Sequence, residues 1–209
     1  MSDTKLNGVL GVLVRVFLRP TPSYTDPSRK DEILAEPSII ISNHTCHMDG
    51  PVLNTVLLPH IVHTLAAKDR FEQRSFGFFL RHTGCIPIDR TKADTSWLHE
   101  SLRILKVQKE SIVIYPEGRH GAHRQQLPFH PAVITLAVMA QVPIVLVYQD
   151  GPARWLHRNR LIFDPPFRLP APAGGVSADY VQQQTDYLQQ RMKELMERFI
   201  AQENDQSRK

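Results

Sequence analysis

Apolar and polar positions along the chain predict alternating strands and helices. Short β-branched runs predict six strands, at residues 38–42, 61–66, 85–88, 111–115, 142–148 and 160–163. Longer amphipathic segments predict five helices, at residues 51–58, 70–82, 94–109, 131–140 and 178–202. This alternation indicates an α/β fold, and we expect a single domain whose mixed, mostly parallel sheet is flanked by helices. Binding sites in such sheets gather at the carboxyl ends of the strands.

The last predicted helix has the clearest single face. Its apolar residues recur at helical spacing, and Ser177 stands where a helix cap is expected. The other faces are rich in glutamine and charge, so we expect the helix to pack by one stripe. That stripe consists of Val181, Leu188, Met192, Leu195, Phe199 and Ile200.

The first twenty residues form a separate unit. The run GVLGVLVRVFL, residues 8–18, is interrupted by Arg15 and is about half the roughly 20 residues that a membrane-spanning helix needs. As a helix it would group Thr4, Gly8, Gly11, Arg15 and Arg19 on one face, with Val9, Leu10, Leu13, Val16 and Phe17 over much of the rest. We expect residues 1–20 to form an amphipathic helix in a membrane interface. Docking on the protein's own core is the alternative, and residues 21–209 are expected to form the main domain.

Composition narrows the class of partner. The 209 residues are 42% hydrophobic and 22% charged, which is ordinary for a globular domain, and the formal net charge is +4. That charge suits an anionic substrate or lipid surface. The chain has no zinc-finger spacing, aromatic RNA-binding motif or long basic block, so no nucleic-acid partner is expected. The chain has only two cysteines, Cys46 and Cys85, so no disulfide framework is expected, and a reducing cytoplasmic compartment fits.

The segment IISNHTCHMDGP, residues 40–51, concentrates titratable chemistry at the end of a predicted strand. His44 and His47 are three apart, but the chain has no His-Glu-x-x-His motif, so we expect no metal site. Cys46 is a weak candidate nucleophile, because a neighbouring histidine in sequence does not by itself bring the side chains together. A small buried thiol is the better interpretation of Cys46.

His44 and Asp49 are the stronger pair. Five residues apart on a continuous helix, they would diverge by about 140°. They meet only if the chain turns between them, and Gly50-Pro51 follows with a break before the next predicted helix. A carboxylate bonded to one imidazole nitrogen fixes the tautomer and leaves the other nitrogen as a base. That base can take a proton from a hydroxyl group.

Four ordered blocks then identify a family. NHTCHMD with its His-x4-Asp spacing, GCIPIDR (84–90), YPEGRHG (115–121) and VPIVLV (142–147) together resemble the PlsC-like glycerolipid acyltransferases, over roughly residues 36–150. The resemblance implies that residues 21–209 form an acyltransferase domain. It implies an acyl-CoA or acyl-carrier-protein donor, a lysophospholipid acceptor, a membrane surface as partner, and no cofactor or metal. It also implies a peripheral position on the inner face of the cell membrane.

The resemblance assigns roles by position. It makes His44 the general base and Asp49 its partner. Acceptor binding is assigned to Gly84 and Arg90 in the second block, where the arginine is expected to hold a phosphate. The third block adds further acceptor contacts from Glu117, Gly118 and Arg119.

The third block departs from the family pattern F-P-E-G-T-R-S. Arg119 stands at the threonine position and His120 at the arginine position, so Arg119 is expected to supply the anion contact from one residue earlier. The reaction expected is acylation of 1-acylglycerol-3-phosphate to phosphatidic acid. A different lyso-lipid acceptor, a non-catalytic lipid-binding relative and a metal-dependent hydrolase remain the alternatives.

Overall fold

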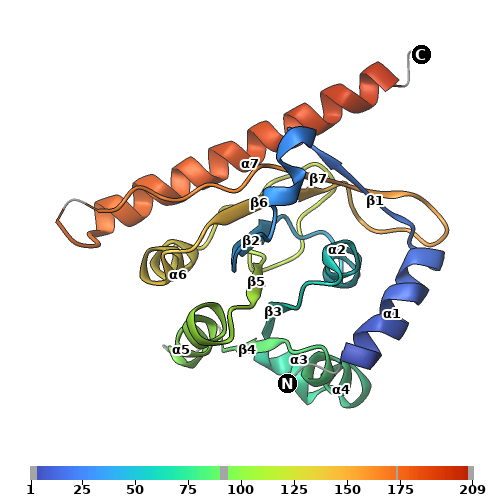
Figure 1. Ribbon diagram of the computed structural model, residues 1–209, viewed down its shortest axis with the longest axis horizontal. Coiled ribbons are helices and arrows are strands. Elements are labelled where there is room, and N and C mark those ends of the chain that lie inside the picture. The colour runs from blue at the N-terminus through green and yellow to red at the C-terminus, as the bar shows by residue number, and fades with distance from the viewer. Residues whose placement is uncertain (1–3, 90–93, 173, 207–209) are drawn as a thin grey trace.

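A computed structural model describes residues 4–89, 94–172 and 174–206, arranged around one seven-stranded sheet (Figure 1). The strand order is β1-β7-β6-β2-β5-β3-β4. The strands are β1 (Pro20–Tyr24), β2 (Ile39–Ser42), β3 (Val62–Ala67), β4 (Ile86–Ile88), β5 (Ser111–Ile114), β6 (Ile144–Gln149) and β7 (Asn159–Phe163). Every pairing is parallel except β6 with β7, so the predicted mixed, mostly parallel sheet is confirmed.

Helices cover both faces of this sheet. They are α1 (Thr4–Phe17), α2 (Asp49–Leu57), α3 (Lys68–Glu72), α4 (Arg74–His82), α5 (Ser96–Arg103), α6 (Ala132–Ala140) and α7 (Ala178–Gln206). In Figure 1, α5 and α6 lie on one side of the central strands and α1 and α2 on the other, while α7 crosses the end of the molecule where β6 and β7 lie and packs into the same core cluster as α5 and α6. No helix among the described residues has the length and apolarity to cross a membrane.

Side-chain alternation in the central strands divides the core into two layers. Ile39 and Ile41 of β2 pack into the cluster under α5, α6 and α7, whereas Ile40 between them packs into the cluster under α1 and α2. Neighbouring β5 repeats the pattern, with Val113 facing α1 and α2. Because successive residues of a strand point to opposite faces, a strand apolar at every position must be covered twice.

The six predicted strands are all present, and residues 20–24, where no strand was predicted, form a seventh. This strand, β1, pairs in parallel with β7 at the end of the sheet. Proline cannot donate a ladder hydrogen bond, so the two prolines of this segment argued against a strand. An edge strand accommodates Pro20 and Pro22 because one side of it has no partner strand. A short 3₁₀-helix, Pro27–Glu32, follows.

Helix boundaries differ from the predictions in several places. The predicted helix 70–82 is two helices, because Gln73 between them has an extended backbone. Gly77 of the second helix packs closely on Phe71 of the first. A Cβ atom at position 77 would lie 2.1 Å from the Phe71 carbonyl oxygen, so only glycine fits there. The predicted helix 94–109 is α5 followed by a π-helical turn, Ile104–Gln108. Helix α7 reaches Gln206, and the Ser177 hydroxyl accepts a hydrogen bond from the Tyr180 N–H, so the predicted cap is confirmed.

Helix α1 is docked on the domain and also exposes apolar side chains. Gly11, Val14 and Leu18 are buried, and a Cβ atom at Gly11 would lie 2.8 Å from Leu58. Gly11 lies one helical turn from Arg15, as expected, and it also belongs to the docked face. The two expected environments of this helix are not exclusive, because Leu13, Val16 and Phe17 face solvent.

Candidate active site

The predicted functional segments follow neighbouring parallel strands. β2 and β5 are paired in parallel, so the His44 segment after β2 and the 115–121 segment after β5 leave the same edge of the sheet. β3 pairs in parallel with β5 as well, which brings the start of α3 to that edge. The fold thus assembles one site from three strand ends, as expected for a parallel sheet.

His44 and Asp49 are in contact. His44 Nδ1 lies 3.0 Å from Asp49 Oδ2, the His44 side chain is 20% exposed, and the Asp49 side chain is 2% exposed. The predicted turn brings them together, with the Asp49 N–H donating to the Cys46 carbonyl oxygen. Helix α2 begins at Asp49, two residues before the predicted start at Pro51, because proline is tolerated anywhere in a first helical turn. The carboxylate therefore sits at the positive end of α2.

Asp49 is held as an ionised acceptor. The backbone N–H groups of Thr45 and Cys46 donate to Oδ2 at 2.6 and 2.8 Å, and the Thr45 hydroxyl donates to Oδ1 at 3.2 Å. Burial acts to raise the pKa of Asp49, but the hydrogen bonds from His44 and these N–H groups outweigh it and lower the pKa. The charged carboxylate then keeps the proton of a neutral His44 on Nδ1, which leaves Nε2 as the basic atom.

The His44 ring is also positioned by its neighbours. Tyr115 stacks on it with ring centroids 4.3 Å apart and planes inclined by 25°, and His120 meets it edge-on at 4.2 Å. The Gly121 N–H donates to the His44 carbonyl oxygen at 2.7 Å. The third block therefore holds the His44 backbone and ring from one side. Two of these contacts come from residues that sequence reasoning did not single out, Tyr115 and Gly121.

On the other side, Asn43 fixes the segment to β6. Its side-chain amide donates to the Gln149 carbonyl oxygen at 3.0 Å and its amide oxygen accepts from the Gln149 N–H at 2.8 Å. The Gln149 side chain donates in turn to the Ser42 hydroxyl at 3.0 Å. All three residues are buried. This bridge continues the strand pairing for one more step by means of a side chain, so the residue before His44 is rigidly placed.

A cavity of about 1020 Å³ opens beside this pair and is lined by His44. Its volume is at the upper end of the range for small-molecule sites, about 300–1,000 Å³. Helix α1 contributes Gly8 and Gly11 to the lining. Apolar side chains from β3, α4, β4, α5 and α6 make up much of the wall: Leu65, Phe79, Leu80, Ile88, Trp97 and Val133. The cavity can therefore take a long apolar group next to the imidazole.

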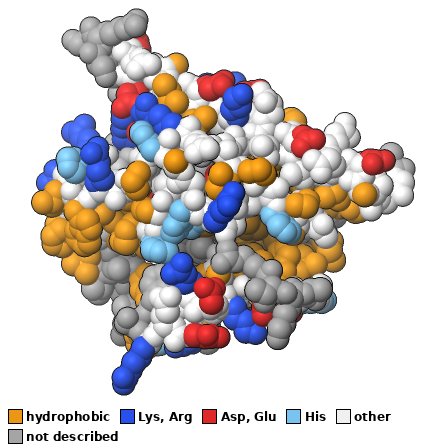
Figure 2. Space-filling model, turned by 180° about the vertical axis from the view of Figure 1, so that it is seen from behind, with side chains coloured by type: hydrophobic (Ala, Val, Ile, Leu, Met, Phe, Trp, Pro, Cys, Tyr) orange, Lys and Arg blue, Asp and Glu red, His pale blue; other side chains and the backbone are white. Residues whose placement is uncertain are grey.

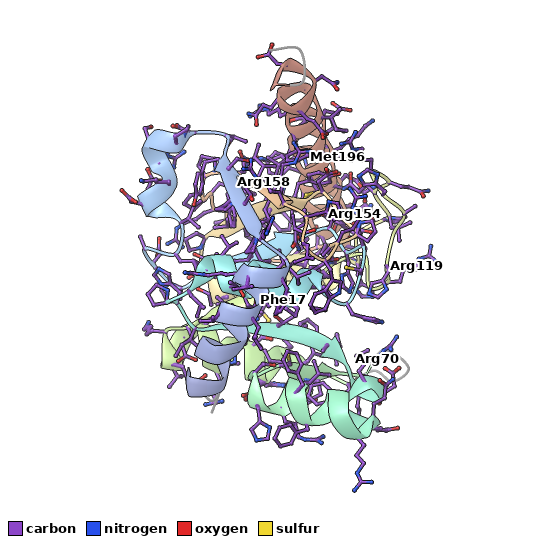
Figure 3. The ribbon with its side chains drawn as sticks, turned by 90° about the vertical axis from the view of Figure 1, so that its right-hand side faces the viewer. Phe17, Arg70, Arg119, Arg154, Arg158 and Met196 are labelled. Carbon is purple, nitrogen blue, oxygen red and sulfur yellow. The ribbon has the colours of Figure 1, made fainter. Side chains whose placement is uncertain are left out.

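Two arginines line the same cavity from different elements. Arg119 follows β5 and is exposed, and Arg70 lies in α3, directly after β3. Figure 3 shows the two labelled side chains on the same side of the molecule, one above and one below the gap between their elements. Burial and the Arg70 charge both lower the pKa of His47, which also lines the cavity. Sequence reasoning missed Arg70, although its place after the predicted strand 61–66 was an available signal.

Glu117 takes a different place from the one expected. It is 8% exposed and does not line the cavity. The carboxyl group lies beneath the loop that it begins, where a Cβ atom at Gly121 would lie 3.1 Å from Oε2. Burial raises the pKa of Glu117 to about 7. The adjacent Gly118, with φ of 65°, does line the cavity, as does Arg119.

The raised pKa of Glu117 predicts a stability that falls with rising pH. Between the ordinary value of 4.5 and about 7, the folded state keeps a proton that the unfolded state has released. Glu117→Gln should therefore match the wild type at pH 3.5, below the ordinary pKa, and exceed its free energy of unfolding by up to about 3 kcal/mol at pH 8. Urea denaturation at both pH values measures this. The exposed Glu197→Gln is the control, and parallel pH profiles for wild type and Glu117→Gln would contradict the prediction.

The remaining predicted residues are distributed as follows. Gly84, with φ of 73°, lies in the turn before β4, where its carbonyl oxygen faces His63 Nδ1 at 2.8 Å, and it lines a second, smaller hollow. Arg90 lies outside the described residues. The Cys46 thiol donates to Asp49 Oδ1 at 3.2 Å, and burial, followed by the Asp49 charge, raises its pKa. A thiol held in its protonated form is a poor nucleophile.

The histidines of the chain do not come together with other possible metal ligands in the part of the chain that the structure describes. No three His, Cys, Asp or Glu side chains there are grouped so that they could hold a metal ion.

Comparison with known proteins agrees with this arrangement. A model of the acyltransferase family matches residues 24–149. A 1-acyl-sn-glycerol-3-phosphate acyltransferase of Bacillus subtilis (strain 168) is 26% identical over 172 residues, which cover 79% of this chain and 85% of that protein. The alpha form of the sheep (Ovis aries) enzyme of that name is 32% identical over 122 residues, 56% of this chain and 42% of that protein.

The fold has a solved counterpart as well. The crystal structure of the 1-acyl-sn-glycerophosphate acyltransferase PlsC from Thermotoga maritima superimposes with a TM-score of 0.65 and 16% identity, covering 95% of this chain and 80% of that one. The family match spans the strand ends that carry His44, Asp49 and the 115–121 segment. The chain therefore belongs to the PlsC-like acyltransferase family, and its enzyme class is that of the acyltransferases.

Proposed function

We propose that this enzyme transfers a fatty acyl group from acyl-CoA or acyl-carrier protein to the hydroxyl of 1-acylglycerol-3-phosphate, giving phosphatidic acid. The observation that carries the proposal is the contact of His44 Nδ1 with Asp49 at 3.0 Å, beside a large and mostly apolar cavity. The names of the relatives in Bacillus subtilis and sheep support this acceptor. Acylation of another lyso-lipid is the runner-up, favoured by His120 at the position where the family has arginine.

The chemistry follows from the placement of His44. As the acceptor oxygen attacks the thioester carbonyl carbon, its proton passes to Nε2, and Asp49 stabilises the imidazolium that forms. The tetrahedral intermediate then breaks its carbon–sulfur bond, and the thiolate takes the proton back from His44. The new ester bond and the free thiol balance the reaction, so neither an acyl-enzyme nor a metal is required.

The cavity and its arginines suit the two ends of the substrates. Apolar side chains such as Leu65, Phe79 and Trp97 provide a wall against which an acyl chain loses contact with water. Arg70 and Arg119 have no ion pair with another element among the described residues, and both face the cavity. A guanidinium binds two phosphate oxygens at once, so these side chains suit the acceptor phosphate.

The site of action follows from the substrates. Acceptor and product are membrane lipids, while the donor is a soluble thioester of the cytoplasm. We therefore place the enzyme as a peripheral protein on the inner face of the cell membrane.

The proposal is tested by thiol release. Purified protein with an acyl-CoA should liberate free thiol only when 1-acylglycerol-3-phosphate is added, and phosphatidic acid should appear in equal amount by mass spectrometry. Running the same assay with other lysophospholipids and with ornithine-type lyso-lipids separates the acceptor classes. A protein that binds these lipids but releases no thiol would instead be a non-catalytic relative. Loss of turnover on addition of a chelator would favour a metal-dependent hydrolase.

Removal of either cavity arginine is expected to weaken use of the phosphate acceptor. Charge-assisted hydrogen bonds contribute about 1.5–3 kcal/mol, so Arg70→Gln and Arg119→Gln should each lower acceptor kcat/KM roughly ten- to a hundred-fold. Steady-state kinetics should show this mainly as a higher acceptor KM, with donor KM unchanged. Arg74→Gln is the matched control, because Arg74 is exposed and does not line the cavity. An unchanged acceptor KM in both variants would contradict the phosphate role.

A further inference from the structure

Two segments that are far apart in the sequence expose bulky apolar side chains side by side. Helix α1 exposes Leu13, Val16 and Phe17, and the loop between β6 and β7 exposes Trp155 and Leu156. Trp155 is 61% exposed and Leu156 is 58% exposed, which is unusual for side chains that gain most from burial. We call these five residues the apolar rim. Figure 2 shows orange side chains gathered at the left edge of the molecule, where α1 lies in that view.

Specific contacts hold the two segments together. The rings of Phe17 and Trp155 have centroids 5.5 Å apart, and the Leu156 N–H donates to the Phe17 carbonyl oxygen. The buried Asn159 side chain donates to the carbonyl oxygens of Leu18 and Arg154, which ties the base of the loop to the end of α1. The apolar rim is therefore one surface fixed by the fold.

The backbone of this surface is strained. Leu156 has φ of 62° and Arg19 has φ of 41°, in the left-handed region that bulky side chains rarely adopt. Such a conformation persists only where the surroundings enforce it. Here the enforced conformation leaves most of the Leu156 side chain in solvent.

The two segments that form the apolar rim carry charged side chains of one sign only. Arg15 and Arg19 come from the α1 segment, and Arg154 and Arg158 come from the loop. Residues 4–19 and 151–158 contain no aspartate or glutamate, and none of the four arginines has an ion-pair partner among the described residues. Figure 3 places labelled Phe17, Arg154 and Arg158 on the side of the molecule that faces the viewer, near the end of α1. The rim thus combines aliphatic, aromatic and cationic side chains.

We propose that the Trp155–Leu156 loop, with Arg154 and Arg158, is a second membrane contact beside the expected one of α1, and that the apolar rim as a whole docks the enzyme on an anionic lipid bilayer. Tryptophan and arginine at the border of an aliphatic patch match the chemistry of the lipid headgroup region. The unopposed positive charge matches anionic lipids. Helix α1 also contributes Gly8 and Gly11 to the cavity lining, so docking brings the cavity beside the membrane. The reason for docking, access to a lipid acceptor, rests on the proposed function, whereas the docking surface itself does not.

Vesicle binding tests the surface directly. Trp155→Ser/Leu156→Ser should reduce co-sedimentation with phosphatidylglycerol–phosphatidylcholine vesicles about tenfold or more, because both side chains lose burial in the interface. Val107→Ser/Val176→Ser is the matched control, since these exposed apolar residues lie elsewhere in the fold, and its binding should be unchanged. Arg154→Glu/Arg158→Glu should weaken binding to anionic vesicles and spare the weaker binding to neutral ones.

Fluorescence gives an independent readout of depth. Trp97 and Trp155 are the two tryptophans of the chain, so Trp97→Phe leaves Trp155 as the single reporter. Its emission should shift to the blue on addition of anionic vesicles and be quenched by brominated lipids. Circular dichroism first establishes that this variant is folded.

An activity comparison separates this inference from the proposed reaction. With a vesicle-bound acceptor, the Trp155/Leu156 variant should lose about tenfold in rate, while with a water-soluble short-chain acceptor it should match the wild type. Wild type that binds vesicles but transfers no acyl group would overturn the proposed function and leave the docking surface standing. Unchanged vesicle binding by the variant, or a dimer in light scattering that the variant abolishes, would overturn the docking surface.

Discussion

His44→Ala is expected to lower kcat for acyl transfer by about 10²–10⁴-fold, the usual contribution of a general base. Nε2 of His44 is the atom that receives the acceptor proton, because Nδ1 is committed to Asp49. The fold should survive, since the His44 side chain is partly exposed and its main anchors, the bonds of Asn43 and the Gly121 N–H, involve the backbone or other side chains. Thiol release measures the rate, and urea denaturation measures the stability.

The matched control for this variant is His99→Ala. His99 is exposed on α5 and does not line the cavity, so its removal should leave kcat unchanged. Added imidazole should restore part of the activity to His44→Ala, because the space left beside Tyr115 can hold a small base. A His44→Ala enzyme that turns over within threefold of wild type would refute the base role.

Asp49→Asn is expected to damage both activity and stability. Asp49 accepts hydrogen bonds from two backbone N–H groups, the Thr45 hydroxyl, the Cys46 thiol and His44. An amide supplies one acceptor oxygen and turns two donor hydrogens toward these groups, so buried donors lose their partners. We expect a loss of about 2–4 kcal/mol in the free energy of unfolding. The wrong tautomer of His44 should lower kcat by about 10²–10⁴-fold.

The stability effect of Asp49→Asn has a defined pH dependence. The pKa of Asp49 is lowered in the folded state, so its stabilising contribution is present above the ordinary value of 3.8 and disappears as pH falls through the lowered value. The free energies of unfolding of wild type and variant should therefore converge in strong acid. Asp186→Asn, an exposed position on α7, is the control. A constant difference at every pH would show that the charge of Asp49 does not stabilise the fold.

The sequence was a good guide to the fold wherever one physical signal dominated. Runs such as III in β2 and IVLVY in β6 are apolar at every position, which only a strand covered on both faces satisfies. Prediction failed where two signals competed. Proline in residues 20–24 concealed an edge strand, and the extended backbone at Gln73 that splits α3 from α4 depends on close packing between Gly77 and Phe71.

For the candidate site, the contact between His44 and Asp49 was predictable from the sequence, whereas the burial of the Glu117 carboxyl group was not. The contact between His44 and Asp49 follows from a turn between the end of β2 and the start of α2, and Pro51 in the first turn of that helix signals the start. Glu117 shares its motif with Gly118 and Arg119, yet its carboxyl group lies under the loop, because the path of residues 118–127 decides which side chains reach the cavity. The place of Arg70 after the predicted strand 61–66 was an available signal, but only the sheet order, with β3 beside β5, brings it to the end of the strand that carries Arg119.

The close approach of Gly11 to Leu58 has a consequence for the choice of acceptor. Because α1 packs this closely on the domain, the membrane docking proposed above would hold His44 at a height over the bilayer that the fold sets. Only a hydroxyl that rises to that height from the lipid plane meets the base. The enzyme would then select acceptors by the distance of their hydroxyl group from the hydrocarbon boundary of the bilayer, in addition to their charge.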